Sequence, residues 1–247
     1  AQIGAERYER NTERTNQRNG YRQREWHTRV GTLDLNIPKL RKGSYFPSLL
    51  EPRKRARSAQ EPVTFRDVSG HWAAQSIQVF TRLGIVKGYE DGTFKPNAPI
   101  TRGEFAAIVA RIFPMDADGG LNVSFTDVQN SWAKEAILTL ASKGILNGYE
   151  DGTFRPDKNI TRAEMVAIMA RIVNLEAFQG AEAVAFTDIA DSWNRDQIMA
   201  AARAGIIKGM ADGSFAPNQN STRAEALTIL LRTLQLNPEL ASLLASL

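Results

Sequence analysis

The pattern of apolar and polar positions along the chain is written three times. Segments that start at Phe65, Phe125 and Phe186 share one order of apolar, turn-forming and polar residues, at spacings of 60 and 61 residues. A repeat of this length is a supersecondary unit that buries its apolar face against its copies. The sequence therefore predicts three units that pack together. We place the units and the short tail after them at residues 61–114, 121–174, 182–236 and 237–247.

Each unit is expected to form a helix, a turn-rich loop and a second helix. In the second unit, apolar residues from Trp132 to Ala141 recur on one stripe of a helix, and Gly144 ends it. The loop carries Asp-Gly and a proline at fixed offsets, which is typical of a tight turn. A phenylalanine of each loop is expected to fill the core: Phe94, Phe154 and Phe215. The Leu-rich tail is expected to pack on the bundle as a cap.

The second helix of every unit begins with Thr-Arg-x-Glu. Thr-x-x-Glu predicts a capping box, in which the Thr hydroxyl accepts from the third helical amide and the Glu returns to the cap amide. Ile100 and Ile160 stand before the cap, where a hydrophobic staple would fix the entry angle. The third unit has Ser221 there, so its staple is predicted to be missing.

Helix capping does not explain the arginine of this motif. At the first helical position a cation meets the positive end of the helix dipole and costs roughly 0.3–1 kcal/mol. A guanidinium beside free helical amides would form a pocket for an anion. The alternative is an ion pair within the protein, and the two interpretations are compatible. The arginines are Arg102, Arg162 and Arg223, and the aspartates that recur as partners are Asp67, Asp127 and Asp188.

A tryptophan follows each of these aspartates by five residues. It could cover the core, which is favoured for the residue by itself, or form a flat platform for a sugar beside an anion-binding arginine. The tryptophans are Trp72, Trp132 and Trp193. Two loop positions could add aromatic or cationic contacts. The aromatic position is Tyr89 in the first repeat and Tyr149 in the second, but Met210 in the third. The cationic position is Lys87 in the first repeat and Lys208 in the third, but Asn147 in the second.

Nothing in the repeats points to catalysis, a cofactor or a metal. The chain has no cysteine, and neither of its two histidines, His27 and His71, recurs. The Asp-Gly turns lack the closely spaced oxygen ligands of a calcium-binding loop. We therefore expect a protein that is not an enzyme. No apolar run approaches the ~20 residues that span a bilayer, so no membrane insertion is expected.

Charge separates the first sixty residues from the repeats. Residues 1–60 carry 14 Lys and Arg against 6 Asp and Glu, a net +8, whereas residues 61–247 carry 17 against 21, a net −4. The alternation over 32–37 predicts a strand or a lone hairpin, which is marginal by itself, so poor order is expected in this basic segment. The chain begins at Ala1 with no charged-then-apolar leader, which indicates a removed leader or a piece of a longer chain.

The motifs RNGY, TRVGTLDLNIPKLRKGSYFPS and LEPR make residues 1–57 resemble a Mutator-type bacterial transposase. The catalytic carboxylates of that family lie in later sequence that does not follow here, so its chemistry is not expected. The alternative function for the chain is weak nucleic-acid contact through the arginines and lysines of this segment. We favour a fusion remnant without a function.

The motifs FxDVxxxW, GYxDGTFxP and ITRxE, repeated over residues 65 to about 234, resemble surface-layer homology (SLH) domains. The resemblance implies a mainly α fold in which three repeats of one chain form a monomeric, pseudo-threefold prism with grooves between neighbours. It also implies noncovalent binding of a secondary cell wall polysaccharide, often pyruvylated, with the motif arginines as anion contacts. The expected location is the cell surface if the chain is exported. A protein–protein scaffold is a third interpretation.

The third repeat departs from this pattern. It lacks the staple isoleucine, the loop tyrosine, and the basic residue that is Lys95 in the first repeat and Arg155 in the second. Its groove is therefore predicted to be structural or weak.

Overall fold

The computed structural model describes residues 22–28, 31–37, 64–113, 121–178 and 185–245. The chain divides into two compact units, residues 1–45 and 46–247. In the first unit, β1 (Arg22–Thr28) pairs antiparallel with β2 (Gly31–Ile37), with Thr28 opposite Gly31. The alternating segment of residues 32–37 lies in β2. The poor order predicted for the rest of residues 1–60 concerns residues outside the described ranges.

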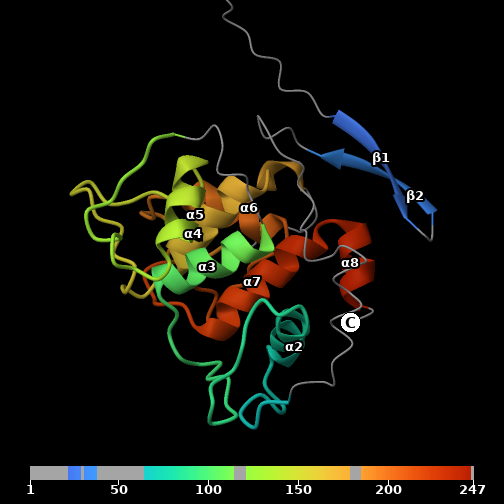
Figure 1. Cartoon of the computed structure of the whole chain (residues 1–247), viewed down its shortest axis with the longest axis horizontal. Coiled ribbons are helices and arrows are strands. Elements are labelled where there is room, and N and C mark those ends of the chain that lie inside the picture. The colour runs from blue at the N-terminus through green and yellow to red at the C-terminus, as the bar shows by residue number, and fades with distance from the viewer. Residues whose placement is uncertain (1–21, 29–30, 38–63, 114–120, 179–184, 246–247) are drawn as a thin grey trace, which may run out of the picture. The chain divides into compact units, whose positions relative to one another are not determined.

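The second unit is mainly α, as predicted, and the described residues contain seven α-helices (Figure 1). Each repeat supplies a first helix, a loop and a second helix. The first helices are α2 (Ala74–Arg82), α4 (Lys134–Ser142) and α6 (Arg195–Arg203). The second helices are α3 (Arg102–Ile112), α5 (Arg162–Ile172) and α7 (Arg223–Gln235). A short 3-10 helix, η2 (Leu175–Ala177), and the final helix, α8 (Pro238–Ala245), complete the unit.

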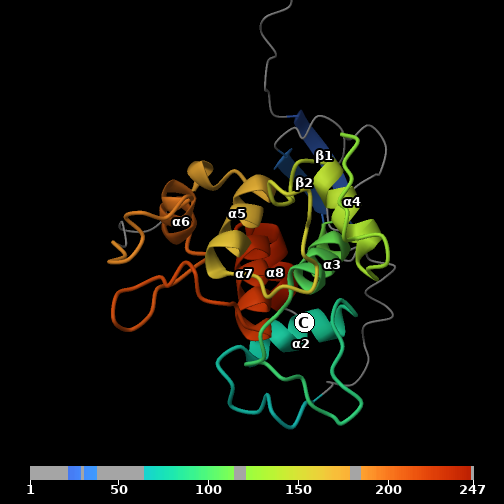
Figure 2. The ribbon, with the colours of Figure 1, turned by 90° about the vertical axis from the view of Figure 1, so that its left-hand side faces the viewer.

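The helices of the three repeats pack in a closed cycle. The first helix of each repeat lies on the second helix of the preceding repeat: α4 on α3, α6 on α5, and α2 on α7. Figure 2 shows α3, α5 and α7 between α2, α4 and α6. Because α2 returns to α7, every repeat contacts both of the others, and every boundary pairs the same elements.

Three backbone hydrogen bonds join the repeats where their second helices begin. The amide of Ile100 donates to the carbonyl of Ser221 at 3.0 Å, that of Ile160 to Ile100 at 3.0 Å, and that of Ser221 to Ile160 at 2.8 Å. All three residues are buried. The third staple position is thus a serine inside the core, and its hydroxyl has no hydrogen-bond partner among the described residues.

The core of each repeat contains a pair of phenylalanines, one from the start of the repeat and one from its loop. Ring centroids lie 5.4 Å apart for Phe65 and Phe94, and the other two repeats match this spacing closely. The loop phenylalanines Phe94, Phe154 and Phe215 are fully buried, which confirms their predicted place in the core. The tail also packs as predicted, because α8 contacts α7 and buries Leu240 and Leu244. Within the described ranges, no helix combines the length and the apolar character that crossing a bilayer requires.

Candidate functional site

Each motif arginine reaches across a repeat boundary. From the start of α3, the Arg102 guanidinium donates to the carbonyl of Phe154 at 2.9 Å and to the carbonyl of Asn147 at 3.1 Å. It also donates to Oε1 of Glu164 at 3.0 Å. All three acceptors belong to the second repeat, so Arg102 fastens the first repeat to the second. Their bonds use three of the five N–H groups that a guanidinium has.

The other two arginines repeat this arrangement around the cycle. Arg162 donates to the carbonyls of Phe215, at 2.7 Å, and Lys208, at 3.3 Å, and forms an ion pair with Glu225. Arg223 donates to the carbonyl of Phe94 at 3.1 Å and lies 3.8 Å from Oε1 of Glu104. The Arg223 contact returns from the third repeat to the first and closes a ring of three ion pairs.

One carboxylate in each repeat serves both the helix cap and the repeat boundary. The capping box predicted at Thr161 is present: the Thr161 hydroxyl accepts from the Glu164 amide, and Oε2 of Glu164 accepts from the Thr161 amide at 2.8 Å. Oε1 of the same side chain accepts from Arg102. The other two capping boxes are also present. The capping-box glutamates, explained from sequence by helix capping alone, are therefore the partners of the arginines.

The predicted alternative, an ion pair with an aspartate, is correct in kind but wrong in partner. Asp127 accepts from the amides of Phe154, at 2.8 Å, and Arg155, at 2.7 Å. Asp67 and Asp188 make the same two contacts in their repeats. Each carboxylate therefore holds its own loop. Burial raises the pKa of Asp67, but the amides that donate to it outweigh this effect, and the pKa lies below its ordinary value.

The residue that these aspartates hold has an unusual backbone conformation. Lys95, Arg155 and Ala216 have φ values of 57°, 59° and 56°, in the left-handed region that disfavours side chains. The two bonds from the aspartate stabilise this turn. The role seen for Asp67, Asp127 and Asp188 is thus to shape the loop onto which an arginine of the preceding repeat docks.

The expectation of free helical amides beside the arginine is wrong. The amides of Arg102 and Gly103 donate to the carbonyls of Lys158 and Pro156 in the next repeat, both at 2.8 Å. The amide of Glu104 donates to its capping threonine. α5 and α7 use their first two amides in the same way. An anion at a repeat boundary would therefore meet side-chain cations rather than a helix end.

Burial makes the ion pairs part of the core of the unit. Arg102 and Arg162 are 6% and 8% exposed, and the Arg223 side chain is 13% exposed. For Glu164, burial raises the pKa, and the Thr161 amide together with the Arg102 charge, Tyr149 and Lys158 lowers it further than burial raises it. The pKa of Glu164 lies below its ordinary value, so this carboxylate is ionised at neutral pH.

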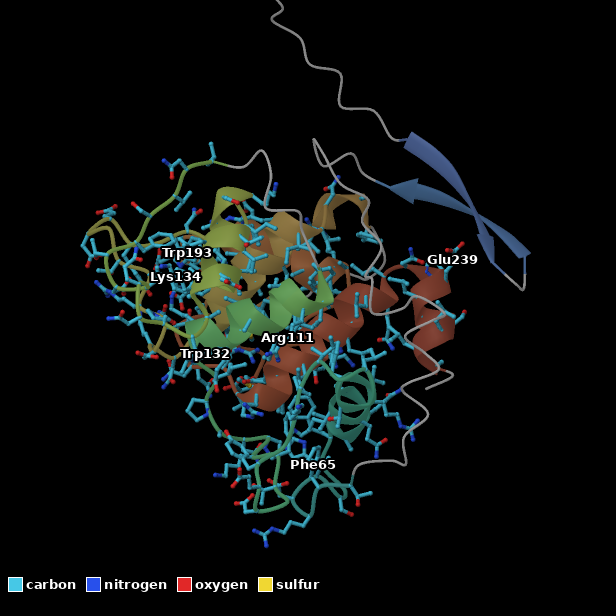
Figure 3. The ribbon with its side chains drawn as sticks, viewed as in Figure 1. Phe65, Arg111, Trp132, Lys134, Trp193 and Glu239 are labelled. Atoms are coloured by element: carbon cyan, nitrogen blue, oxygen red, sulfur yellow. The ribbon has the colours of Figure 1, made fainter. Side chains whose placement is uncertain are left out.

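The tryptophans lie on the surface, so their interpretation as core residues is wrong. Trp72, Trp132 and Trp193 are 62%, 67% and 66% exposed. The next residue of each repeat points inward instead, as the burial of Ala73 and Ala133 shows. In Figure 3, Trp132 and Trp193 lie on the side of the bundle away from α8. Their exposed faces fit the alternative interpretation, a platform for a ligand.

A cleft of about 270 Å³ opens between the second and third repeats. Its lining includes a residue of the first repeat as well, so all three repeats contribute. The lining residues that matter for binding are Trp72, Arg162, Lys208, Met210, Glu225 and Arg232. The cleft thus lies against the loop of the third repeat, whose groove the sequence predicted to be structural or weak.

The other predicted loop residues have varied surroundings. Tyr149 donates to Oε1 of Glu164 at 2.9 Å and accepts from Lys158 at 2.9 Å, so it covers the Arg102–Glu164 pair. Tyr89 is 42% exposed, and the Lys95 ammonium nitrogen lies over its ring, 4.1 Å from the ring centroid. Lys87 and Lys208 are exposed. Lys208 contacts Arg162 through its backbone carbonyl, and Asn147 contacts Arg102 in the same way, so this contact does not require a lysine.

Sequence reasoning missed Arg232 and its counterparts, Arg111 and Arg171, near the ends of the second helices. Their recurrence after an apolar stretch was the available signal. Arg111 donates to the carbonyl of Ile85 at 2.9 Å and Arg171 to that of Ile145 at 3.2 Å. Arg232 lines the cleft instead. In the described part of the chain, no group of three or more His, Cys, Asp or Glu residues has the arrangement of a metal site.

Comparisons with known proteins match both parts of the chain. The S-layer homology domain model matches residues 64–106, 124–166 and 185–227, and the model for Transposase, Mutator family, matches residues 1–66.

Curated relatives match more than half of the chain. The cellulosome-anchoring protein of Acetivibrio thermocellus is 35% identical over 160 residues, which cover 62% of this chain and 36% of that protein. The S-layer protein EA1 of Bacillus anthracis is 31% identical over 172 residues, 69% of this chain and 20% of that protein. The amylopullulanase of Thermoanaerobacterium thermosulfurigenes is 35% identical over 179 residues, 70% of this chain and 10% of that protein.

The chain therefore spans between 10% and 36% of the length of these relatives. The family model covers more than half of the chain, and the ring of arginines and capping glutamates lies within the matched repeats. The chain belongs to the S-layer homology domain family, with three SLH domains that follow a segment of the Mutator transposase family.

Proposed function

We propose that the three SLH domains anchor this chain noncovalently to the bacterial cell wall by binding an anionic secondary cell wall polysaccharide. The observation that carries the proposal is the charge and shape of the cleft between the second and third repeats. Arg162, Lys208 and Arg232 line it against a single carboxylate, Glu225, so its described lining has a net charge of +2. An exposed tryptophan, Trp72, lies in the same lining.

These features suit an acidic glycan. A guanidinium binds a carboxylate or phosphate group in a planar, bidentate manner, and an indole offers a flat apolar surface to a sugar ring. A pyruvyl ketal would supply a carboxylate on the sugar itself. The names of the relatives, a cellulosome-anchoring protein and an S-layer protein, agree with a surface-anchoring role. We place the chain at the cell wall if it is exported, as a binding protein rather than an enzyme.

The closed cycle of helices supports a further part of the proposal, a pseudo-threefold prism made by one chain. Every boundary pairs a first helix with the preceding second helix, and an Arg–Glu pair spans every boundary. We therefore expect the chain to be monomeric. Sedimentation equilibrium would test this, because a mass of two or three chains would contradict it.

Cosedimentation with purified cell wall sacculi tests the proposed function. The full chain should pellet with the sacculi, and soluble wall polysaccharide should release it. Binding that the polysaccharide does not compete with would favour a protein–protein scaffold. A chain that stays in the supernatant would contradict wall anchoring.

The basic N-terminal segment supports a second candidate function. Its net charge of +8 and its match to the Mutator family favour weak contact with nucleic-acid phosphates. This interpretation predicts DNA binding that weakens steeply with salt and disappears when residues 1–60 are deleted. Wall binding should survive the same deletion, so one pair of proteins separates the two functions.

A further inference from the structure

Three arginines hold equivalent positions near the ends of the second helices, and one of them differs from the others. Arg111 and Arg171 each donate to the carbonyl of the isoleucine that follows the first helix of their own repeat. Arg232 occupies the same place in α7, but its guanidinium has no acceptor among the residues that the structure describes. It lines the cleft together with Ile206, the isoleucine of the third repeat that is equivalent to Ile85 and Ile145.

The arginine of the second repeat has a further acceptor. When the amide of Asn147 is oriented to satisfy both of its groups, its oxygen accepts from Arg171 at 3.1 Å. The corresponding residue is Lys208 in the third repeat and Lys87 in the first, and neither has an acceptor on its side chain, so this position does not explain why Arg232 lacks the carbonyl bond that Arg111 makes. Arg232 and Lys208 both line the cleft and bring two positive charges into it.

The cleft owes its room to a second difference. In the second repeat, Tyr149 donates to Glu164 and covers the Arg102–Glu164 pair. The third repeat has Met210 at this position, in the lining of the cleft, and a thioether cannot donate such a bond. The Arg162–Glu225 pair consequently borders an open cleft rather than a tyrosine hydroxyl.

The two guanidinium groups of the cleft have different roles. The charge of Arg162 is balanced by Glu225, and two carbonyls of the third repeat hold its other groups. Arg232 is half-buried and has no described carboxylate to balance it, and burial lowers its pKa. A partly desolvated cation without a partner is the stronger attractor for an incoming anion.

We infer that Arg232 is the primary anion contact in the cleft between the second and third repeats, and that Arg162 is a positioning residue that holds the cleft wall. This inference rests on the proposed function and names its ligand group more closely. The ligand is a glycan whose carboxylate or phosphate group binds Arg232 and whose sugar ring lies against Trp72, with Lys208 as a supplementary charge.

Four versions of the full chain test the inference by cosedimentation with purified sacculi: the wild type, Arg232→Met, Met210→Tyr and Arg111→Met. Arg232→Met removes the charge and keeps an apolar stem. Met210→Tyr fills the cleft and leaves Arg232 in place. Arg111→Met is the matched control, because this arginine occupies the equivalent place in the first repeat and is not part of the described cleft lining.

The inference predicts that Arg232→Met and Met210→Tyr each weaken binding by about tenfold or more, the loss expected when a charged hydrogen bond goes unmade. Arg111→Met should bind like the wild type. Unfolding midpoints for all four proteins show whether a loss reflects the cleft or the fold. If Arg232→Met destabilises the chain, Met210→Tyr still decides the case.

The possible results distinguish a failure of the inference from a failure of the proposed function. Wild-type binding with undiminished binding of Arg232→Met and Met210→Tyr would overturn the role of Arg232 and leave wall anchoring intact. A wild type that does not bind sacculi would overturn both. Mild acid treatment of the sacculi removes ketal-linked pyruvate but leaves phosphate esters, so it distinguishes the two anions. Loss of binding after treatment identifies a ketal carboxylate, and retained binding identifies a phosphate. Either result supports an anionic ligand only if binding of Arg232→Met is impaired.

Discussion

Glu225 accepts the guanidinium of Arg162 with one carboxylate oxygen and caps its own helix, α7, with the other. A local capping motif thereby becomes the contact between two repeats. Because the same relationship holds at all three boundaries, the start of each second helix and the assembly of the repeats depend on each other. A repeat without its neighbour would lose these contacts and expose to water the charged groups that the assembled unit buries and pairs.

The first prediction concerns this pair. Arg162→Ala removes one partner of a buried ion pair and leaves the other partly buried, which costs about 3–5 kcal/mol. Urea unfolding followed by circular dichroism should show the loss. Arg155→Ala is the control, because its pair with Asp151 is solvent-exposed and such pairs contribute little. Equal, small effects for both variants would contradict a structural role for the Arg162 pair.

The second prediction concerns acid stability. The folded-state pKa of Glu164 lies below its ordinary value of 4.5, so the carboxylate contributes stability above about pH 4.5 that is lost as the pH falls through the folded pKa. The wild type should therefore lose free energy of unfolding between pH 6 and pH 3. Glu164→Gln should be less stable at pH 6 and lose less on acidification. Parallel curves for the two proteins would show that this group is not responsible.

The third prediction concerns the buried serine. The Ser221 hydroxyl has no described hydrogen-bond partner, and an unsatisfied buried group costs about 1–3 kcal/mol, so Ser221→Ala should raise the free energy of unfolding by roughly 1 kcal/mol. Ser76→Ala is the matched control. The buried Ser76 hydroxyl lies 3.3 Å from that of Thr228, so its removal should lower the free energy of unfolding. A loss of stability in Ser221→Ala would mean that its hydroxyl has a partner.

The fourth prediction concerns the left-handed turn. Ala216 has a φ of 56°, a conformation that costs a residue with a side chain roughly 1–2 kcal/mol, so glycine should relieve strain there. Part of the gain is offset by the greater freedom of glycine in the unfolded chain. Ala216→Gly should still stabilise the protein, whereas Ala200→Gly, within α6, should destabilise it by about 1 kcal/mol. Thermal unfolding of both variants tests this: the unfolding midpoint should rise for Ala216→Gly and fall for Ala200→Gly.

The sequence predicts the contacts that are close along the chain better than those that are distant. The capping box of Thr161 and Glu164 spans three residues, and its pattern is sufficient to recognise it. The partner of Arg102 lies 62 residues away, in another repeat, and its glutamate already had a local explanation. The sequence motif accounts for the carboxylate oxygen of Glu164 that caps the helix, but it does not indicate that the other oxygen binds Arg102.

Surface and cleft residues were harder to predict for another reason. The core interpretation of Trp132 failed because the inward direction is taken by Ala133, and a single aromatic residue at a helix start does not reveal which way it points. Arg232 recurs with Arg111 and Arg171, and recurrence does not show that one of the three has different surroundings. What distinguishes Arg232 is the cleft beside it, whose lining includes Met210 where the other two repeats have a tyrosine.

The most direct test of the account is equilibrium binding of the full chain to purified secondary cell wall polysaccharide, measured by calorimetry at several salt concentrations. The account predicts saturable binding that weakens as salt rises, because an anionic group must reach the cations of the cleft. Absence of binding to the anionic polymer, or equally tight binding to a neutral glycan of the same length, would contradict it.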